Sequence, residues 1–193
     1  MHFYASSSYP YMEKIKEFAQ LINQRNEIDH KIVKDYIGRP AEKGHIAEWI
    51  ASKAFPITLN ERRNQSEYDG VFNSGSLKDK HVDIKYLAVN NRILDINNKL
   101  TSEVYLLVFT GPYEAAQSSK DKVRPFCISN IYLFNENELC RELKDNEVHV
   151  GIATSVRKKY WEENEIYPNN KENLDIELNR EVIELFRCKN LLR

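Results

Sequence analysis

The sequence predicts an α/β or α+β domain built on one β-sheet. Two observations predict this class. An apolar helical repeat occupies the first part of the chain, and short runs of β-branched and aromatic residues, separated by turn residues, follow it. The chain has 193 residues, which is enough for one compact domain with a sizeable core. We therefore expect residues 1–193 to form a single domain.

Two helices are expected before the first strand. Apolar side chains recur at helical spacing over residues 12–34, with a break at Arg25, and a Gly-Arg-Pro segment then ends this helix. A second helical pattern covers residues 41–55 and stops before Pro56. Residues 1–40 are therefore expected to form an N-terminal helical extension.

The middle of the chain changes to the short period that is typical of strands. We expect strands at residues 68–72, 80–86, 103–110 and 125–134. Turn residues at 73–76 join the first two strands into a hairpin. The third strand is dense in Val, Tyr, Leu and Phe, which predicts a buried central position.

The last part, residues 135–193, is expected to contain a strand and several helices. Asn135 is the expected cap of a short helix, and a short strand is expected at residues 148–152. Ser155 and Asn173 are the expected caps of two further helices.

Charge and hydropathy exclude several classes of protein. The 28 basic and 29 acidic residues nearly cancel, so a nucleic acid must bind to a local patch rather than to a general basic field. The longest apolar run, residues 104–109, is far shorter than the roughly 20 residues of a membrane-spanning helix, so no membrane partner is expected. The N-terminus shows no pattern of a secretory signal.

The cysteines and the known short motifs narrow the classes further. Cys127, Cys140 and Cys188 are odd in number, widely spaced and without a CxxC pair, which argues against a disulfide scaffold or a thiolate zinc site. A reducing, cytoplasmic compartment is therefore expected. The patterns GxGxxG, GxxxxGK(S/T) and GxSxG are absent, which disfavours dinucleotide binding, P-loop NTP binding and serine-based hydrolysis.

A candidate catalytic site begins on the strand at residues 80–86. Side chains alternate between the two faces of a strand, so Asp83 and Lys85 share one face while Val82 and Ile84 share the other. Asp69 starts the preceding strand, and the hairpin is expected to bring it near Asp83. The neighbouring Gly70 leaves room for a close approach.

Glu48 is the fourth member of the predicted site. It lies on the second helix among small neighbours, which would let this helix approach the sheet and direct Glu48 at the two aspartates. Three carboxylates at one point repel each other unless a cation joins them, and oxygen ligands select Mg²⁺ or Mn²⁺. The alternative is a surface ion pair between Asp83 and Lys85, worth about 0–1 kcal/mol, and an exposed Glu48.

The order of these residues resembles that of a known family. Glu48, then Tyr68-Asp69-Gly70, then Val82-Asp83-Ile84-Lys85 is similar to the PD-(D/E)xK nuclease superfamily, which has the restriction-endonuclease-like fold. Tyr68 stands where the family name has proline. The resemblance covers residues 41–134, and a wider string from Arg25 to Glu48 also resembles a group of small bacterial proteins.

The resemblance implies a fold, a reaction and a set of roles. The implied fold is a restriction-endonuclease-like core with a central mixed β-sheet flanked by helices. The implied activity is Mg²⁺- or Mn²⁺-dependent hydrolysis of DNA by a type II restriction or defence endonuclease that works as a homodimer. Asp69, Asp83, the backbone carbonyl of Ile84 and Glu48 would hold the metal, and Lys85 would assist the attacking water. The alternative is a catalytically inactive nuclease fold that binds DNA or protein.

Basic residues near the predicted site are candidates for contacts with DNA. These are His45, Arg62, Arg63, Lys78 and Lys80. Solvated or packed side chains are the alternative for each of them. Arg25 and Asp29 share a polar face of the first helix and would either reach the DNA backbone or fix that helix. Trp161, which follows a basic run, would either stack on a base or pack in the core.

Overall fold

The computed structural model describes residues 9–60, 68–97, 102–116, 118, 120, 122–169 and 176–188. The chain divides into two compact units, residues 1–45 and 46–193, and each is described by itself. Arg62 and Arg63, which were predicted to contact DNA, lie outside the described residues. So does Asn173, the predicted cap of the last helix.

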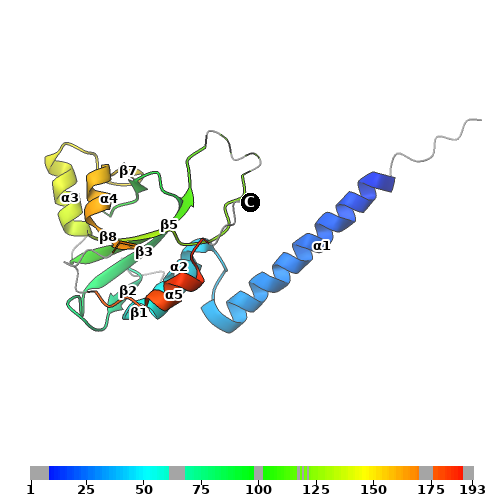
Figure 1. The fold of residues 1–193 in the computed structure, drawn as a ribbon, viewed down its shortest axis with the longest axis horizontal. Coiled ribbons are helices and arrows are strands. Elements are labelled where there is room, and N and C mark those ends of the chain that lie inside the picture. Colours follow the sequence, from blue (N-terminus) through cyan, green and yellow to red (C-terminus); the bar gives the residue numbers. More distant parts are fainter. Residues whose placement is uncertain are drawn as a thin grey trace, which may run out of the picture. The chain divides into compact units, whose positions relative to one another are not determined.

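The first unit is dominated by one long helix, α1 (Tyr9–Ile32). It continues into a π-helical turn, η1 (Val33–Ile37), which ends at Gly38. Gly38 has a φ of 71° and its N–H donates to the carbonyl oxygen of Val33 at 2.7 Å, so the chain leaves the helix through the left-handed conformation that glycine tolerates. The helix predicted for residues 12–34 is therefore confirmed, and Figure 1 shows it as one continuous rod.

The second unit is built on a six-stranded sheet (Figure 1). Its strands, in spatial order, are β1 (Ile57–Leu59), β2 (Gly70–Phe72), β3 (His81–Val89), β5 (Val104–Tyr113), β6 (Asn130–Asn135) and β8 (Glu165–Tyr167). The central pair β3 and β5 is parallel and every other pair is antiparallel. The predicted α/β class with a central mixed sheet is thus confirmed, and so is the hairpin, in which Gly70 pairs with Val82.

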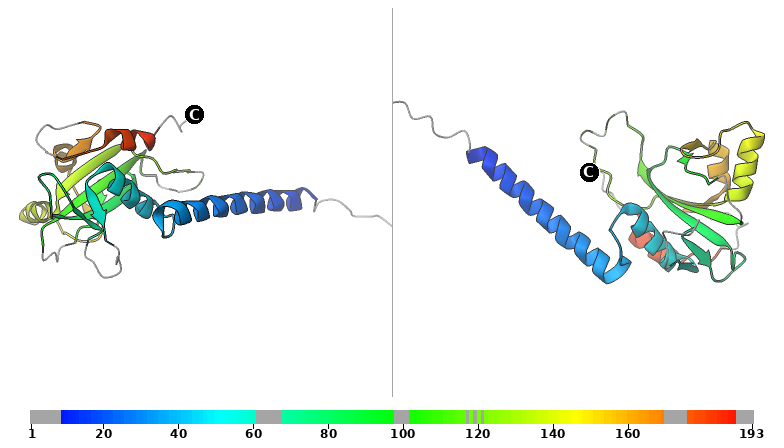
Figure 2. Two further views of the ribbon diagram at one scale, coloured as in Figure 1. Left: turned by 90° about the horizontal axis from the view of Figure 1, so that it is seen from below. Right: turned by 180° about the vertical axis from the view of Figure 1, so that it is seen from behind.

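Helices cover both faces of this sheet (Figures 1 and 2). On one face lie α2 (Lys43–Ala54) and α5 (Arg180–Leu185), and Ile50 and Ile183 pack there in one apolar cluster with Val82 and Ile84. On the other face lie α3 (Glu136–Asp145) and α4 (Lys158–Glu163), whose apolar residues pack with Leu106. Successive residues of β5 therefore enter two separate cores, whereas β3 contributes Val82 and Ile84 to the core on the α2 side.

The C-terminal part follows the prediction only in some elements. Asn135 caps α3, because its side chain accepts a hydrogen bond from the Glu138 N–H at 3.2 Å. The strand predicted at residues 148–152 is wrong: the described strand is β7 (Thr154–Ser155), which pairs with β4 (Ile93–Leu94). Ser155 is in that strand and does not cap α4, which begins three residues further on at Lys158 and has Arg157 at its N-cap position.

A disulfide joins Cys127 to Cys188, which corrects the expectation from the cysteine spacing. The two residues are 61 positions apart, but Ile128 forms a bridge with Arg187 and its N–H donates to the Phe186 carbonyl at 2.9 Å. Tertiary pairing of these segments brings the cysteines together, and spacing along the sequence carries no signal of it. Cys140 is a free thiol.

A helix that crosses a bilayer needs a long apolar stretch. Within the described ranges, none is both long enough and apolar enough to cross a membrane.

Candidate functional site

The candidate site is centred on the charged face of β3. Asp83 pairs in register with Leu106 and Lys85 with Val108, so both charged side chains lie on the α3 side of the sheet. The Lys85 ammonium is 2.8 Å from a carboxylate oxygen of Asp83. The Asp83 side chain is 16% exposed and that of Lys85 is 36% exposed, so the pair is partly withdrawn from water but still reachable.

Asp69 completes this group at the edge of β3. The backbone N–H of Asp69 donates to the Val82 carbonyl at 2.9 Å, which extends the β2–β3 pairing by one residue. Two residues further along β3, the backbone N–H of Ile84 donates a hydrogen bond to a carboxylate oxygen of Asp69 at 2.7 Å. The side chain of Asp69 thus takes the place of a strand partner. Asp69 lies close to Asp83, as the hairpin predicted.

Gly70 is required by its neighbour β1. A Cβ atom at this position would lie 2.6 Å from the carbonyl oxygen of Thr58, closer than real Cβ contacts occur. The close approach expected from the sequence is therefore made by protein backbone. It draws β1 against β2 directly beside Asp69.

The electrostatics of the site reflect two carboxylates held close together. Burial raises the pKa of Asp83, the Lys85 ammonium lowers it, and the negative charge of Asp69 raises it again, to a net value of about 6. For Lys85, burial lowers the pKa, but Asp83, Asp69 and Glu136 outweigh burial and leave it above its usual value. Lys85 is therefore a protonated hydrogen-bond donor at neutral pH, while Asp83 is close to its titration point.

Glu136 is a site residue that sequence reasoning missed. It is the first residue of α3 and is fully buried. One carboxylate oxygen accepts a hydrogen bond from the Asn97 N–H at 2.8 Å, and the other has no hydrogen-bond partner among the described residues. Burial raises its pKa, the Asn97 N–H lowers it and Asp83 raises it, to about 7. Acidic residues are common in the first turn of a helix, so its sequence position carried no sign of this role.

Glu48, the predicted helix carboxylate of the site, is buried on α2. Glu48 is 6% exposed on α2, the helix whose buried residues pack with Val82 and Ile84. These two residues occupy the face of β3 opposite to Asp83, where the Lys85 ammonium contacts the Asp83 carboxylate. The helix does approach the sheet through small residues, since Ala47 and Ala51 are fully buried. A place for Glu48 in the metal site stays a prediction.

The oxygen atoms of the candidate site are possible ligands of a divalent metal ion. Among the described residues, no group of three or more His, Cys, Asp and Glu side chains is arranged to hold a metal. Asp69 and Asp83 with the Ile84 carbonyl form a smaller set. Mg²⁺ in phosphate chemistry is commonly held by one or two carboxylates together with waters and substrate phosphates. The residues present therefore fit Mg²⁺ or Mn²⁺, and they do not fit zinc.

The predicted DNA contacts have different surroundings. The Lys80 ammonium forms an ion pair with Glu103, which raises the pKa of Lys80 and offsets its charge. Lys78 is exposed in the turn between β2 and β3, where its N–H donates to the Gly75 carbonyl at 3.2 Å. A ring nitrogen of His45 lies 2.7 Å from the Pro40 carbonyl oxygen. Of these three, Lys78 is the best available cation.

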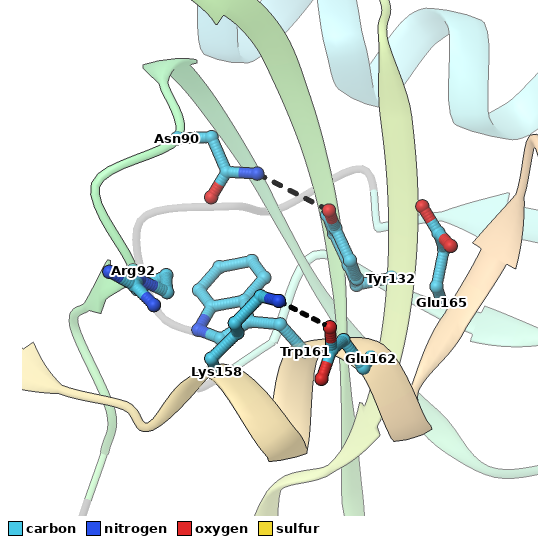
Figure 3. Close-up of a pocket in the computed structure, with 7 residues that line it drawn as sticks. All are labelled: Asn90, Arg92, Tyr132, Lys158, Trp161, Glu162 and Glu165. Carbon is cyan, nitrogen blue, oxygen red and sulfur yellow. Dashed lines mark hydrogen bonds and ion pairs between the residues drawn. The ribbon is translucent and has the colours of Figure 1, made fainter. Parts of the chain in front are cut away.

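A separate cavity of about 370 Å³ lies beside α4, and Figure 3 shows the seven residues that line it. Its lining combines two cations, Arg92 and Lys158, with two carboxylates, one of which pairs with Lys158 at 2.8 Å. Trp161 is 3% exposed and packs edge-on against Tyr132, with the ring centroids 4.7 Å apart. Trp161 is thus a core residue, which was the alternative to base stacking, and the balanced charges select no ligand.

Comparison with known proteins identifies no relative. No family model matches the chain, and neither the curated proteins nor the solved structures contain a match.

Proposed function

We propose that the chain is a metal-dependent nuclease that hydrolyses phosphodiester bonds in DNA, of the type II restriction or defence kind. The observation that carries the proposal is the convergence on β3: Lys85 lies 2.8 Å from Asp83, and Asp69 accepts from the intervening Ile84 N–H at 2.7 Å. Two acids and one amine, from adjacent strands in this order, are what the resemblance to the PD-(D/E)xK superfamily requires.

Asp69, Asp83 and the carbonyl of Ile84 would hold Mg²⁺ or Mn²⁺. When bound, the ion lowers the pKa of a water ligand and neutralises charge on the phosphate. Lys85 is protonated, so it acts as a donor to the attacking water or to the phosphate oxygens and does not remove a proton itself. Glu136 is a positioning residue, because its charge is among those that keep Lys85 protonated.

A second candidate is a nuclease fold that binds DNA without cutting it. The observation that favours it is the absence, within the described part of the chain, of a group of three acidic or histidine ligands. Lys78 would then contribute to a local patch, since the net charge of −1 supplies no general attraction.

The test is cleavage of supercoiled plasmid by the purified protein with Mg²⁺ or Mn²⁺. Asp83→Asn and Lys85→Met should each lower the rate by about 10²–10⁴-fold, because each removes a group that acts on the reacting phosphate. The matched controls are Asp145→Asn and Lys144→Met on the exposed end of α3, which should leave the rate unchanged.

The outcomes separate the two candidates. Metal-dependent cleavage that both site variants abolish supports the nuclease. Affinity for DNA that falls as salt rises, without cleavage by the wild type, supports the inactive binding module. If neither cleavage nor salt-sensitive binding occurs with duplex DNA, single-stranded DNA or RNA, both proposals are wrong.

A further inference from the structure

Within the first unit, the long helix α1 carries an apolar stripe. Ile15, Phe18, Leu21, Ile22 and Ile28 are between 38% and 65% exposed. At 100° per residue, these five side chains fall within less than half of the helix circumference. A stripe of this size on a helix is typical of an interaction surface rather than of scattered surface residues.

The stripe follows a seven-residue repeat with alternating steps of three and four. The repeat runs through Ile15, Phe18, Ile22, Arg25, Asp29 and Ile32. This spacing keeps one seam facing a partner helix along its length, which is the condition for a two-helix coiled coil. Leu21 and Ile28 flank the seam and widen it.

Two charged residues interrupt the seam at its centre. Within one chain, Arg25 and Asp29 form an exposed ion pair with 3.5 Å between nitrogen and oxygen. A parallel pair of helices would place Arg25 against Arg25 and Asp29 against Asp29. The seam residues alternate between two heptad positions, with Arg25 at one and Asp29 at the other. In an antiparallel pair the first position faces the second, so Arg25 of each helix can lie against Asp29 of the other.

The charges also select the register of such an antiparallel pair. When Arg25 faces Asp29, Ile22 of each chain faces Ile32 of the other. A shift by one repeat would instead set Arg25 against Ile22 and Asp29 against Phe18, which would bury each charge against an apolar side chain. In this register both charges are paired and residues 22–32 of the two helices overlap, while Ile15 and Phe18 extend beyond the partner's α1.

We propose that α1 pairs with α1 of a second copy of this chain as an antiparallel coiled coil, with crossed Arg25–Asp29 ion pairs at its centre. The inference stands on α1 alone and holds whether or not the second unit is a nuclease.

The charge of α1 argues for a protein partner rather than a membrane surface. Residues 9–32 contain four acidic and four basic residues. Helices that lie on membranes are rich in lysine and arginine on the polar face, because they bind anionic lipids. A balanced set of charges suits pairing between two identical helices.

The test is the mass of the full chain in solution, followed by sedimentation over a concentration series. The wild type should dimerise, and Ile22→Asp should weaken the dimer by roughly 100-fold, because it sets a carboxylate against Ile32. Gln20→Asp on the opposite face of α1 is the matched control and should leave the dimer unchanged. Thermal unfolding of both variants should match that of the wild type in the second unit.

Charge exchange tests the crossed pairs. Arg25→Asp alone and Asp29→Arg alone should each weaken self-association by about tenfold or more, whereas an equal mixture of the two variants should form a heterodimer. The double variant R25D/D29R should dimerise like the wild type. If the mixture stays monomeric, the repulsion lies within each chain and the proposal is overturned.

Cysteine cross-linking tests the direction of the helices, in a Cys140→Ser background. An antiparallel pair in this register joins Ile22→Cys protein to Ile32→Cys protein on mild oxidation, and neither variant joins itself. Self-joining of the Ile22→Cys protein would overturn the antiparallel arrangement. A wild type that is monomeric throughout the series, or that binds anionic vesicles as a monomer, would overturn the pairing as a whole.

Discussion

The two faces of strand β3 differ in almost every physical property. Val82 and Ile84 point into an apolar core and are at most 4% exposed. Asp83 and Lys85 alternate with them and point to the opposite face, where the fully buried Glu136 adds another carboxylate. One short stretch of chain thus stabilises the fold on one side and concentrates charge on the other. On the charged face, burial raises the pKa values of Asp83 and Glu136, so keeping these carboxylates ionised costs stability.

The largest effect on stability is expected on the apolar face. Ile84→Ala removes a buried side chain that packs beneath α2, so the free energy of unfolding should fall by about 2–5 kcal/mol. Urea unfolding followed by circular dichroism measures it. The control is Ile93→Ala, because the side chain of Ile93 is 38% exposed. It should lower the free energy of unfolding by much less than Ile84→Ala does. Equal losses for both variants would mean that burial beneath α2 does not determine the cost of removing Ile84.

A gain in stability is expected on the charged face. The pKa of Glu136 is raised to about 7 from 4.5, so the folded state holds its proton more tightly than the unfolded state, and wild-type stability falls as pH rises through this range. Glu136→Gln is neutral at every pH and keeps the acceptor for Asn97. It should raise the free energy of unfolding by about 3 kcal/mol near pH 8.

The pH dependence distinguishes this effect from a simple change in packing. The gain from Glu136→Gln should vanish below pH 4.5, because the wild-type carboxyl is then neutral in both states. Glu138→Gln, on the exposed side of the same helical turn, is the control and should change little. A gain that is equal at low and high pH would show that the charge of Glu136 is not its cause.

The smallest effect is expected at the lysines beside the site, and it applies if the chain binds DNA. Lys78→Ala should weaken binding a few-fold and reduce the salt slope by about one, as the loss of one phosphate contact does. Lys80→Ala should change the affinity less, because Glu103 already pairs with this ammonium. Fluorescence anisotropy over a salt series compares the two, and a larger loss for Lys80→Ala would reverse this ranking.

The parts of the site that could be predicted are those encoded locally. Alternation along β3 is a property of any strand, so the shared face of Asp83 and Lys85 followed from their spacing. The turn at residues 73–76 predicted the hairpin that carries Asp69 toward Asp83. The Asn135 cap was visible for the same reason, since its hydrogen bond spans three residues.

The parts that could not be predicted depend on which elements meet in space. Glu136 reaches the site because α3 covers the Asp83 face, and α2, with Glu48, covers the other. The alternation of β3 predicts that two faces exist but not which helix covers each. Likewise, the ion pair of Lys80 with Glu103, the residue just before β5, depends on a pairing between distant segments that the sequence does not reveal.

The bond between Cys127 and Cys188 closes a covalent ring around residues 128–187. β6, α3, α4, β8 and α5 lie inside this ring, whereas β3 with its acids lies outside it. Because the two cysteines are 61 positions apart, the ring removes enough freedom from the unfolded chain to stabilise the fold by about 4 kcal/mol on the chain-entropy account. A thiol reductant would therefore loosen the shell that holds Glu136 while leaving the hairpin of Asp69 and Asp83 without any broken bond.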